Sequence, residues 1–465
     1  MSAPHVSLAT KLSYGIGGFG KDFNLIIVNT FLFFYYTDIA GASAYFVGLV
    51  FLGARIWDTI NDPIFGYLVA KTKSRWGKYK PWILVGNILN AIALVMLFSA
   101  HLLDGTAQYV YIAVTYVIWG MCYTFCDAPF WSLIPTITLD KTERERLLPF
   151  PRIAATLGSY LASGCGIYAV NLFASGEDKG PGYIALGTIA GVLALASAIV
   201  TCIWTKQTYE DADEKKENEI SLSKALKLVF KNDQFLIFLG IAISYCFATN
   251  LVNGLNLYFV KYVIGDTELF SFMMLWAGIF GVGSLFFFKQ MISALSRRRL
   301  FLISMILPFI ASVLLLGAAN SAELQMFLIA VAGILTGLSN AVYWLIVMIM
   351  VADTVDYGDV KFGIRSESIS YSLHTLVNKC SGAICSLIMG LLLTAVGYVP
   401  NVEQTEQTIQ GISVTYVGIS VFCLVAAVIY MRWYKLNGKG LDQIQANVDR
   451  LILERSASII RTMLS

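Results

Sequence analysis

Residues 45–80 read YFVGLVFLGARIWDTINDPIFGYLVAKTKSRWGKYK, and this stretch carries the pattern that decides the fold. Its first part, 45–70, is long and apolar enough to cross a bilayer as a helix, which needs about 20 mostly apolar residues. Its last part, 71–80, contains several Lys and Arg residues and no acidic residue. The stretch therefore predicts a membrane helix that holds charged residues and is followed by a basic loop.

The same apolar pattern recurs along the whole chain. Hydrophobic residues make up 57% of the sequence and charged residues 14%, whereas a soluble domain has about 25% charged residues. No alternating pattern of bilayer-facing strands competes with it. We predict an all-α membrane protein with about twelve transmembrane helices, near residues 12–38, 45–70, 81–101, 108–135, 150–175, 183–205, 234–263, 268–289, 300–318, 323–352, 366–398 and 412–434.

The distribution of basic residues predicts the orientation. Lys and Arg concentrate in the loops that stay in the cytoplasm. The loop 71–80 is basic, and the run 297–299 is entirely Arg. The connections without Lys or Arg are 41–44, 104–108, 265–268 and 402–411. The N-terminal residues do not resemble a cleaved signal peptide. We therefore expect a multi-pass protein of the bacterial inner membrane with both termini in the cytoplasm.

A long polar stretch divides the predicted spans into two sets of six. It covers 206–233 and is rich in Glu, Asp and Lys. Two such halves around a midplane site are the plan of the major facilitator fold. The predicted parts are an N-terminal six-helix bundle over 1–205, a cytoplasmic middle loop over 206–233, a C-terminal six-helix bundle over 234–434 and a cytoplasmic tail over 435–465.

The sequence lacks the residues that several classes of function require. The net charge of +3 argues against a nucleic-acid partner, because phosphate recognition needs concentrated positive charge. The eight cysteines form no paired metal or disulfide motif, and the three histidines do not cluster. The glycine-rich run 15–20 opens an apolar span, which favours close helix packing over phosphate binding. We predict that the protein is not an enzyme and needs no cofactor.

Among the charged side chains inside the predicted spans, eight form the candidate set. Such charges are costly in a bilayer unless they pair or face a cavity. Four are basic and four are acidic, and this balance indicates a shared polar cavity that could recruit a mobile cation. The eight residues are Lys21, Asp22, Arg55, Asp58, Asp62, Asp127, Arg152 and Lys379.

Asp58, Asn61 and Asp62 have the spacing i, i+3, i+4, which places them on one face of a helix. Carboxylate and amide oxygens are hard ligands that suit a small cation, and a bound Na⁺ would relieve the repulsion between the two acids. Their interaction could instead raise one pKa enough to hold a proton. A third alternative is that the acids only neutralise Arg55 and Lys379.

Tyr123, Asp127 and Trp131 share a face of the fourth predicted span, beside Thr124. A carboxylate between aromatic rings is suited to a sugar, because the acid accepts from hydroxyls while a ring covers the apolar face. Arg152 could add a forked donor. The alternative is a structural pair between Asp127 and Arg152.

Further candidates lie in the second half of the chain. Trp344 falls in the tenth predicted span. On the eleventh, His374 pairs with Asn378 and Thr375 with Lys379 at spacing i, i+4. A lone histidine usually serves packing, and its polar neighbours make this one a candidate substrate contact.

Seven motifs resemble those of the glycoside–pentoside–hexuronide:cation symporter family, which belongs to the major facilitator superfamily and includes melibiose carriers. The resemblance spans nearly the whole chain, and several of the motifs run over eight or more residues. The motifs are KDF at 21–23, YYTD at 35–38, RIWDTINDP at 55–63, SRWGKYKPW at 74–82, DAPFWS at 127–132, LDK at 139–141 and VADTVDYG at 351–358.

The resemblance implies symport of a galactoside such as melibiose with Na⁺, Li⁺ or H⁺. It implies that the cation is held by Asp58, Asn61, Asp62 and Thr124. It implies sugar contacts from Lys21, Asp22, Tyr123, Asp127, Trp131, Arg152, Trp344, Thr375 and Lys379. It implies a cytoplasmic charge network, securing the outward-facing state, of Arg144, Asp353, Asp356, Arg365 and Glu367.

Three positions depart from the family pattern. His374 and Asn378 stand where the family has Gln and Val, and Asn29 replaces an aromatic residue. The cation motif is intact while one wall of the sugar pocket differs, so a differently substituted glycoside is also compatible. The alternatives are a proton-coupled carrier of another glycoside, pentoside or glucuronide, and a membrane sensor that binds a ligand without transporting it.

Overall fold

The computed structural model describes residues 6–138, 143, 146–205, 230–362, 367–400, 402–438, 440–441, 443–444, 446–447 and 450. In the first half of the chain the elements are α1 (Leu8–Ile27), η1 (Val28–Leu32), η2 (Tyr35–Ile39), α2 (Ala44–Lys71), α3 (Lys80–Leu97), η3 (Ala100–Leu102), α4 (Gly105–Ser132), α5 (Ile134–Ile137), α7 (Pro149–Leu172) and α8 (Gly180–Trp204). In the second half they are α10 (Asp233–Phe259), η4 (Val260–Ile264), α11 (Glu268–Phe286), α12 (Phe288–Ala294), α13 (Arg297–Ala319), α14 (Gln325–Phe362), α15 (Glu367–Ala395) and α16 (Glu406–Trp433).

Each predicted span coincides with one long helix, and four of these helices begin at a residue whose side chain caps the first turn. The side chains of Ser7, Asn232, Ser296 and Thr405 accept hydrogen bonds from backbone N–H groups in the first turns of α1, α10, α13 and α16. Such caps satisfy donors that have no partner within the helix. The largest difference is α14, which runs to Phe362 and so continues ten residues past the predicted end at 352.

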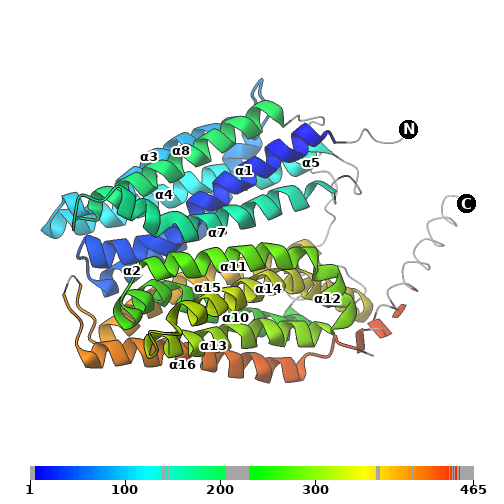
Figure 1. Ribbon diagram of the computed structural model, residues 1–465. Helices are drawn as coiled ribbons and strands as arrows, with labels where there is room; N and C mark the ends of the chain where they lie inside the picture. The colour runs from blue at the N-terminus through cyan, green and yellow to red at the C-terminus, as the bar shows by residue number, and fades with distance from the viewer. Residues whose placement is uncertain are drawn as a thin grey trace, which may run out of the picture.

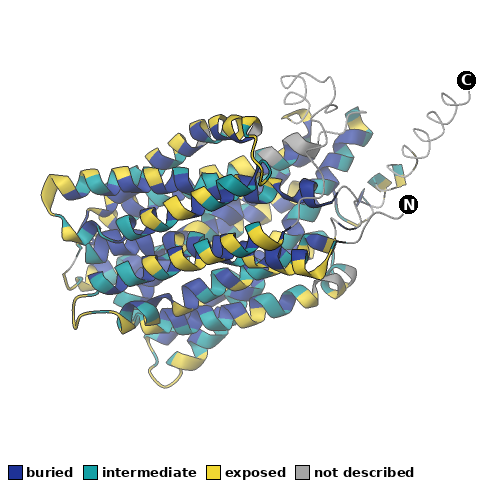
Figure 2. Cartoon of the chain, turned by 90° about the horizontal axis from the view of Figure 1, so that it is seen from above, coloured by how far each residue is buried: buried dark blue, intermediate teal, exposed yellow. Residues whose placement is uncertain are grey.

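Ten of the described helices are long and apolar enough to cross a membrane. α1 and α2 are not among these ten, and they carry five of the eight charged residues predicted within spans. Many large apolar side chains on the helices are exposed, such as Val192, Ile203 and Phe422. Figure 2 shows exposed residues along the outer faces of the helices and buried residues between them. An apolar outer surface of this kind suits contact with lipid.

The helices form two bundles that follow the two halves of the chain (Figure 1). In the first, α1 packs on α7 and α8, and α3 packs on α4 and α8. In the second, α13 packs on α14 and α16, and α10 packs on α15 and α16. The two bundles meet along α2 with α15 and along α7 with α11. A site between the halves is therefore framed by these four helices and by α1, α4, α10 and α14.

The predicted glycine run allows α1 to approach its neighbours closely. A Cβ atom on Gly18 would lie 2.6 Å from the backbone oxygen of Pro151 on α7, and one on Gly20 would lie 1.9 Å from Ser197 Oγ on α8. Only glycine permits these contacts without a shift of the helices. The run serves helix packing, as the sequence indicated.

α1 begins and α16 ends at the same end of the molecule, which we call the terminal end; the opposite end is the distal end (Figure 1). The basic loop after α2 and the arginine run that opens α13 both lie at the terminal end, because successive spans alternate in direction. The distal end holds the loops without basic residues around 41–44 and 265–268.

Candidate substrate and cation sites

Lys21 joins two acidic residues of the first half. Its side chain is 9% exposed, and its Nζ lies 2.7 Å from Asp22 Oδ1 and 2.7 Å from Asp127 Oδ1. A buried ammonium is stable only when it is paired in this way. One cation therefore holds the carboxylates of α1 and α4 together at the same place.

Aromatic residues of α4 surround this cluster. Tyr123 Oη accepts from Lys21 Nζ at 3.3 Å, and Trp131 Nε1 donates to Asp127 Oδ1 at 3.2 Å. The guanidinium of Arg152 lies 4.7 Å from the centre of the Trp131 ring. Asp127 is thus paired with Lys21, while Arg152 stacks on the neighbouring ring. The Asp127 side chain remains 34% exposed, which leaves room for a ligand to donate to Oδ2.

The two acids of α2 lie along one face of α4. Thr124 Oγ1 donates to Asp62 Oδ1 at 3.1 Å. One turn earlier on α4, a Cβ atom on Gly120 would lie 2.8 Å from Asp58 Oδ1. Both pairs follow the spacing i, i+4, so both carboxylates face the same side of α4. Asn61 is 5% exposed and lies between them on α2.

Each of these acids also has a basic partner. Arg55 NH1 lies 3.3 Å from Asp58 Oδ2 on the same helix. Lys379 Nζ, on α15 of the other half, lies 2.6 Å from Asp62 Oδ2. The Lys379 pair crosses the interface between the halves, and its ammonium occupies an oxygen that a coupling cation would need.

The second-half candidates divide into two groups. Trp344 is 45% exposed although it lies near the middle of α14, and Thr375 and Lys379 are exposed on α15. His374 is 1% exposed and packs against Phe238 within the bundle. His374 therefore lies inside the second-half bundle, beside a polar neighbour one turn further along α15.

That neighbour is Asn378, which lies in a short chain of polar contacts. Its Nδ2 lies 3.1 Å from His374 Nε2, and its Oδ1 accepts from Cys246 Sγ on α10 at 2.7 Å. Neither Cys246 nor Gly120 was among the site residues predicted from the sequence. Neither residue has a signal in the sequence, because each acts through a residue on another helix.

Of the predicted charge network, Asp353 pairs with an arginine outside the predicted set. Asp353 Oδ1 accepts from Arg297 NH2 at 3.1 Å, and both residues are at the terminal end. Arg297 was predicted only as part of a basic loop. Asp356 lies one turn further along α14. Arg144, Arg365 and the side chain of Glu367 lie outside what the structure describes.

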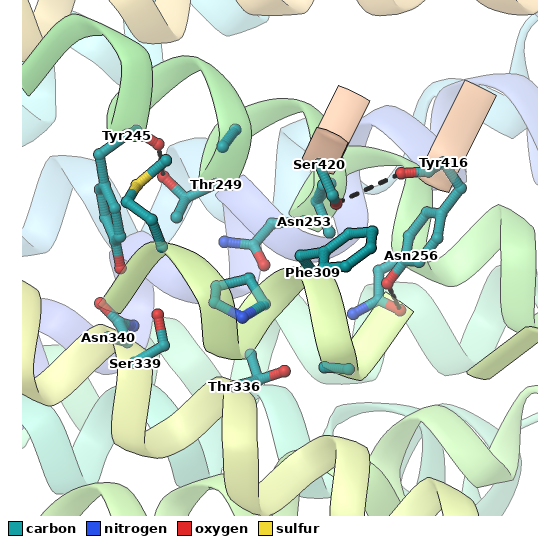
Figure 3. A pocket seen from close by; sticks show the side chains of 15 residues that line it. Tyr245, Thr249, Asn253, Asn256, Phe309, Thr336, Ser339, Asn340, Tyr416 and Ser420 are labelled. Carbon is teal, nitrogen blue, oxygen red and sulfur yellow. Dashed lines mark hydrogen bonds between the residues drawn. The ribbon is translucent and has the colours of Figure 1, made fainter. Parts of the chain in front are cut away.

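A cavity that the sequence did not predict lies inside the second half (Figure 3). Its polar groups are Asn, Ser, Thr and Tyr side chains of α10, α14 and α16, α13 adds apolar side chains, and no charged residue is among its lining. Tyr416 Oη donates to Asn256 Oδ1 at 3.1 Å across it. A smaller cavity lies in the first half between the corresponding helices α1, α3, α4 and α8, and Lys21 and Asn87 line it.

Two bundles of membrane helices that meet along their length are a known arrangement, and comparison with solved structures shows this fold. The nucleoside transporter NupG superposes with a TM-score of 0.64 at 14% identity, over 90% of this chain and 98% of that one. The chain therefore has the major facilitator fold, as the sequence predicted.

The family follows from the sequence match. Residues 13–438 match the profile described as MFS/sugar transport protein, and the chain belongs to this family. It is a transporter and not an enzyme. The inner membrane symporter YicJ of Escherichia coli (strain K12) is 30% identical over 96% of this chain and 95% of the relative. Lactose permease of Lactobacillus delbrueckii subsp. bulgaricus is 28% identical over 87% of this chain and 66% of the relative.

Proposed function

We propose that the protein is a secondary active symporter that couples uptake of a galactoside or related glycoside to Na⁺, with Li⁺ or H⁺ as alternative cations, by alternating access. The observation that carries the proposal is the contact of Lys379 Nζ with Asp62 Oδ2, 2.6 Å across the interface. It ties a carboxylate of the candidate cation site to the other half of the transporter.

The sugar side rests on the cluster around Asp127. A carboxylate with an open oxygen, an indole ring and the Arg152 guanidinium together offer an acceptor, an apolar face and a forked donor. These groups match a pyranose. The similarity to lactose permease favours a galactoside, since lactose is one.

The cation side rests on the facing sides of α2 and α4. Asp58 Oδ1 and Asp62 Oδ1 both face α4, and Lys379 neutralises Asp62 from the other half. A small cation bound to these acids would compete with Lys379 for Asp62 and release its ammonium. Cation binding would then change the contact between the halves, and we expect this change to tighten sugar binding. Because such coupling is reciprocal, the sugar would tighten cation binding by the same factor.

The membrane potential can then drive accumulation. One charge moving down the potential supplies about 2.3 kcal/mol per 100 mV. We propose that the terminal end, with its basic loops, faces the cytoplasm of a bacterial inner membrane.

The second candidate is a proton-coupled carrier of a pentoside or glucuronide. Arg152 favours it, because this exposed guanidinium could pair with the carboxylate of a glucuronide. The Lys379 contact fits this candidate equally well, because a proton on Asp62 would break the same ion pair as Na⁺ would.

Uptake by the purified protein in proteoliposomes tests the proposal. Lactose, melibiose, a pentoside and a glucuronide are each supplied with Na⁺, Li⁺ or choline between pH 5.5 and 8. We expect Na⁺ to lower the KM for a galactoside about tenfold, equivalent to about 1.4 kcal/mol. Uptake that responds to pH but not to Na⁺ or Li⁺ at any pH would establish the proton-coupled alternative.

Gly120→Ala is expected to weaken Na⁺ activation about tenfold. The added Cβ would lie 2.8 Å from Asp58 Oδ1 and must displace that carboxylate. The Na⁺ concentration that gives half-maximal uptake measures the effect. The matched control is Gly53→Ala on α2, where an added Cβ meets nothing within 4 Å. Equal Na⁺ dependence in the two variants would place the cation away from Asp58.

A further inference from the structure

Asp38 lies at the distal end, away from both candidate sites. It follows the first long helix, in η2, and its side chain is 0% exposed. A buried carboxylate is stable only when its oxygens receive hydrogen bonds or a countercharge. The groups that satisfy Asp38 therefore show what holds the distal end together.

Three of the four donors to Asp38 come from the other half of the transporter. Oδ1 accepts from Lys261 Nζ at 2.6 Å and from Tyr262 Oη. Oδ2 accepts from Tyr398 Oη at 2.5 Å, and also from its neighbour Thr37 at 2.9 Å. We call Asp38, Lys261, Tyr262 and Tyr398 the distal latch. Each oxygen of the carboxylate thus has one donor or more from the second half.

The latch connects two segments that leave the ordinary α-helical path. Asp38 lies in the π-helical η2, which ends the first long helix of its half. Lys261 and Tyr262 lie in the π-helical η4, which ends α10, the first long helix of the other half. π-helical turns are rare and often lie at functional sites. The same position in each half therefore has the same unusual backbone, and the two meet at Asp38.

η2 makes further contacts in both halves. Tyr35 of η2 donates to the backbone oxygen of Phe98, at 2.7 Å within the first half. Thr37 contacts Tyr258 Oη of α10, in the second half, at 2.5 Å. Around them, Phe34 packs edge-on against Tyr258 with ring centres 5.2 Å apart. The carboxylate of Asp38 is therefore enclosed, and protein groups take the place that water would have on it, while the side chain of Lys261 is 33% exposed.

We propose that Asp38 is the release point of a gate at the distal end. The latch keeps the halves together there, and the gate opens only when water replaces the three second-half donors on Asp38. The latch shares no residue with the proposed sugar and cation sites. It sets how readily the distal end opens, whichever substrate and cation the transporter uses.

Reaction of a buried thiol with a maleimide measures this opening. The reporter is Ser271→Cys, which conserves shape: Ser271 is 0% exposed near the distal start of α11. It shares a face with Leu275 and Gly278, which contact α7 of the other half. Cys165, Cys202 and Cys380, which are not buried, are replaced by Ser throughout. The full-length protein is labelled in lipid nanodiscs, where both ends are accessible, without sugar or Na⁺.

Asp38→Asn should raise the labelling rate at least about tenfold, and Lys261→Gln should do the same from the other half. Tyr398→Phe removes one hydroxyl and should raise the rate less. The control is Asp104→Asn, an exposed acid in a distal loop, which should leave the rate unchanged. Equal rates for Asp38→Asn, Lys261→Gln and Asp104→Asn in monodisperse protein would overturn the proposal. Because the assay contains no ligand, its outcome is independent of whether the proposed sugar and cation are correct.

Discussion

Asp127→Asn is expected to reduce sugar affinity at least about 100-fold. The change removes the charge that Lys21 Nζ contacts at 2.7 Å and weakens the acceptor for Trp131 Nε1. It also replaces the open carboxylate oxygen by a weaker or donating group. Hydrogen bonds to a charged group contribute about 1.5–3 kcal/mol each. The loss of two such bonds between the sugar and the Asp127 carboxylate accounts for the expected effect. Equilibrium binding of a radiolabelled galactoside to the purified protein measures it.

The same variant should still bind the cation. Lys21 keeps its contact with Asp22, and the contacts of Asp58 and Asp62 with α4 are unchanged. Na⁺ protection against thermal unfolding is the readout, with Asp104→Asn as the control for loss of one acid. If Asp127→Asn binds sugar as tightly as Asp104→Asn, Asp127 does not belong to the sugar site. Loss of both ligands would mean that Asp127 serves the fold.

Lys379→Gln is expected to separate cation binding from transport. Without the ammonium 2.6 Å from Asp62 Oδ2, Na⁺ has no competitor at that oxygen, and its affinity should rise about tenfold. Sugar accumulation against a gradient should nevertheless fall to the level of equilibration, because cation binding no longer changes a contact between the halves. Na⁺ titration by thermal shift and uptake into proteoliposomes give the two quantities.

A double variant makes this test sharper. Lys379→Gln with Asp62→Asn leaves no unpaired charge, so it should be more stable than either single variant while still failing to accumulate sugar. Because Lys379 is half exposed, we expect the stability differences to be modest. If Lys379→Gln binds Na⁺ with unchanged affinity, Lys379 does not compete for the cation site.

The positions of the membrane helices could be predicted from the sequence alone. The length of an apolar run is a local property, and the run predicted at 183–205 became α8, Gly180–Trp204. The alternation between loops with Lys or Arg and loops without them is likewise visible in short stretches of sequence. The end of α14 was predicted ten residues too early, because its polar last turns at the terminal end resemble a loop in composition.

The composition of the site was also predictable, whereas its pairings were not. Helical spacing places Asp58 and Asp62 on one face of α2, and both indeed face α4. From the sequence, Asp127 could either pair with Arg152 or bind a ligand. The structure pairs it with Lys21 of α1. His374 lies inside the bundle although its spacing with Asn378 suggested a shared cavity wall.

By itself, the sequence determined where the long helices lie, which loops are basic and which charged groups share a helix face. These depend on hydrophobicity and on the 3.6-residue helical repeat, which act over short stretches of chain. Only the tertiary structure decided that Lys379 reaches Asp62, that Gly120 makes room for Asp58 and that Asp38 meets Lys261. Those contacts depend on how helices distant in sequence are rotated and packed against one another. The helical repeat of one segment does not specify which other helix it packs against.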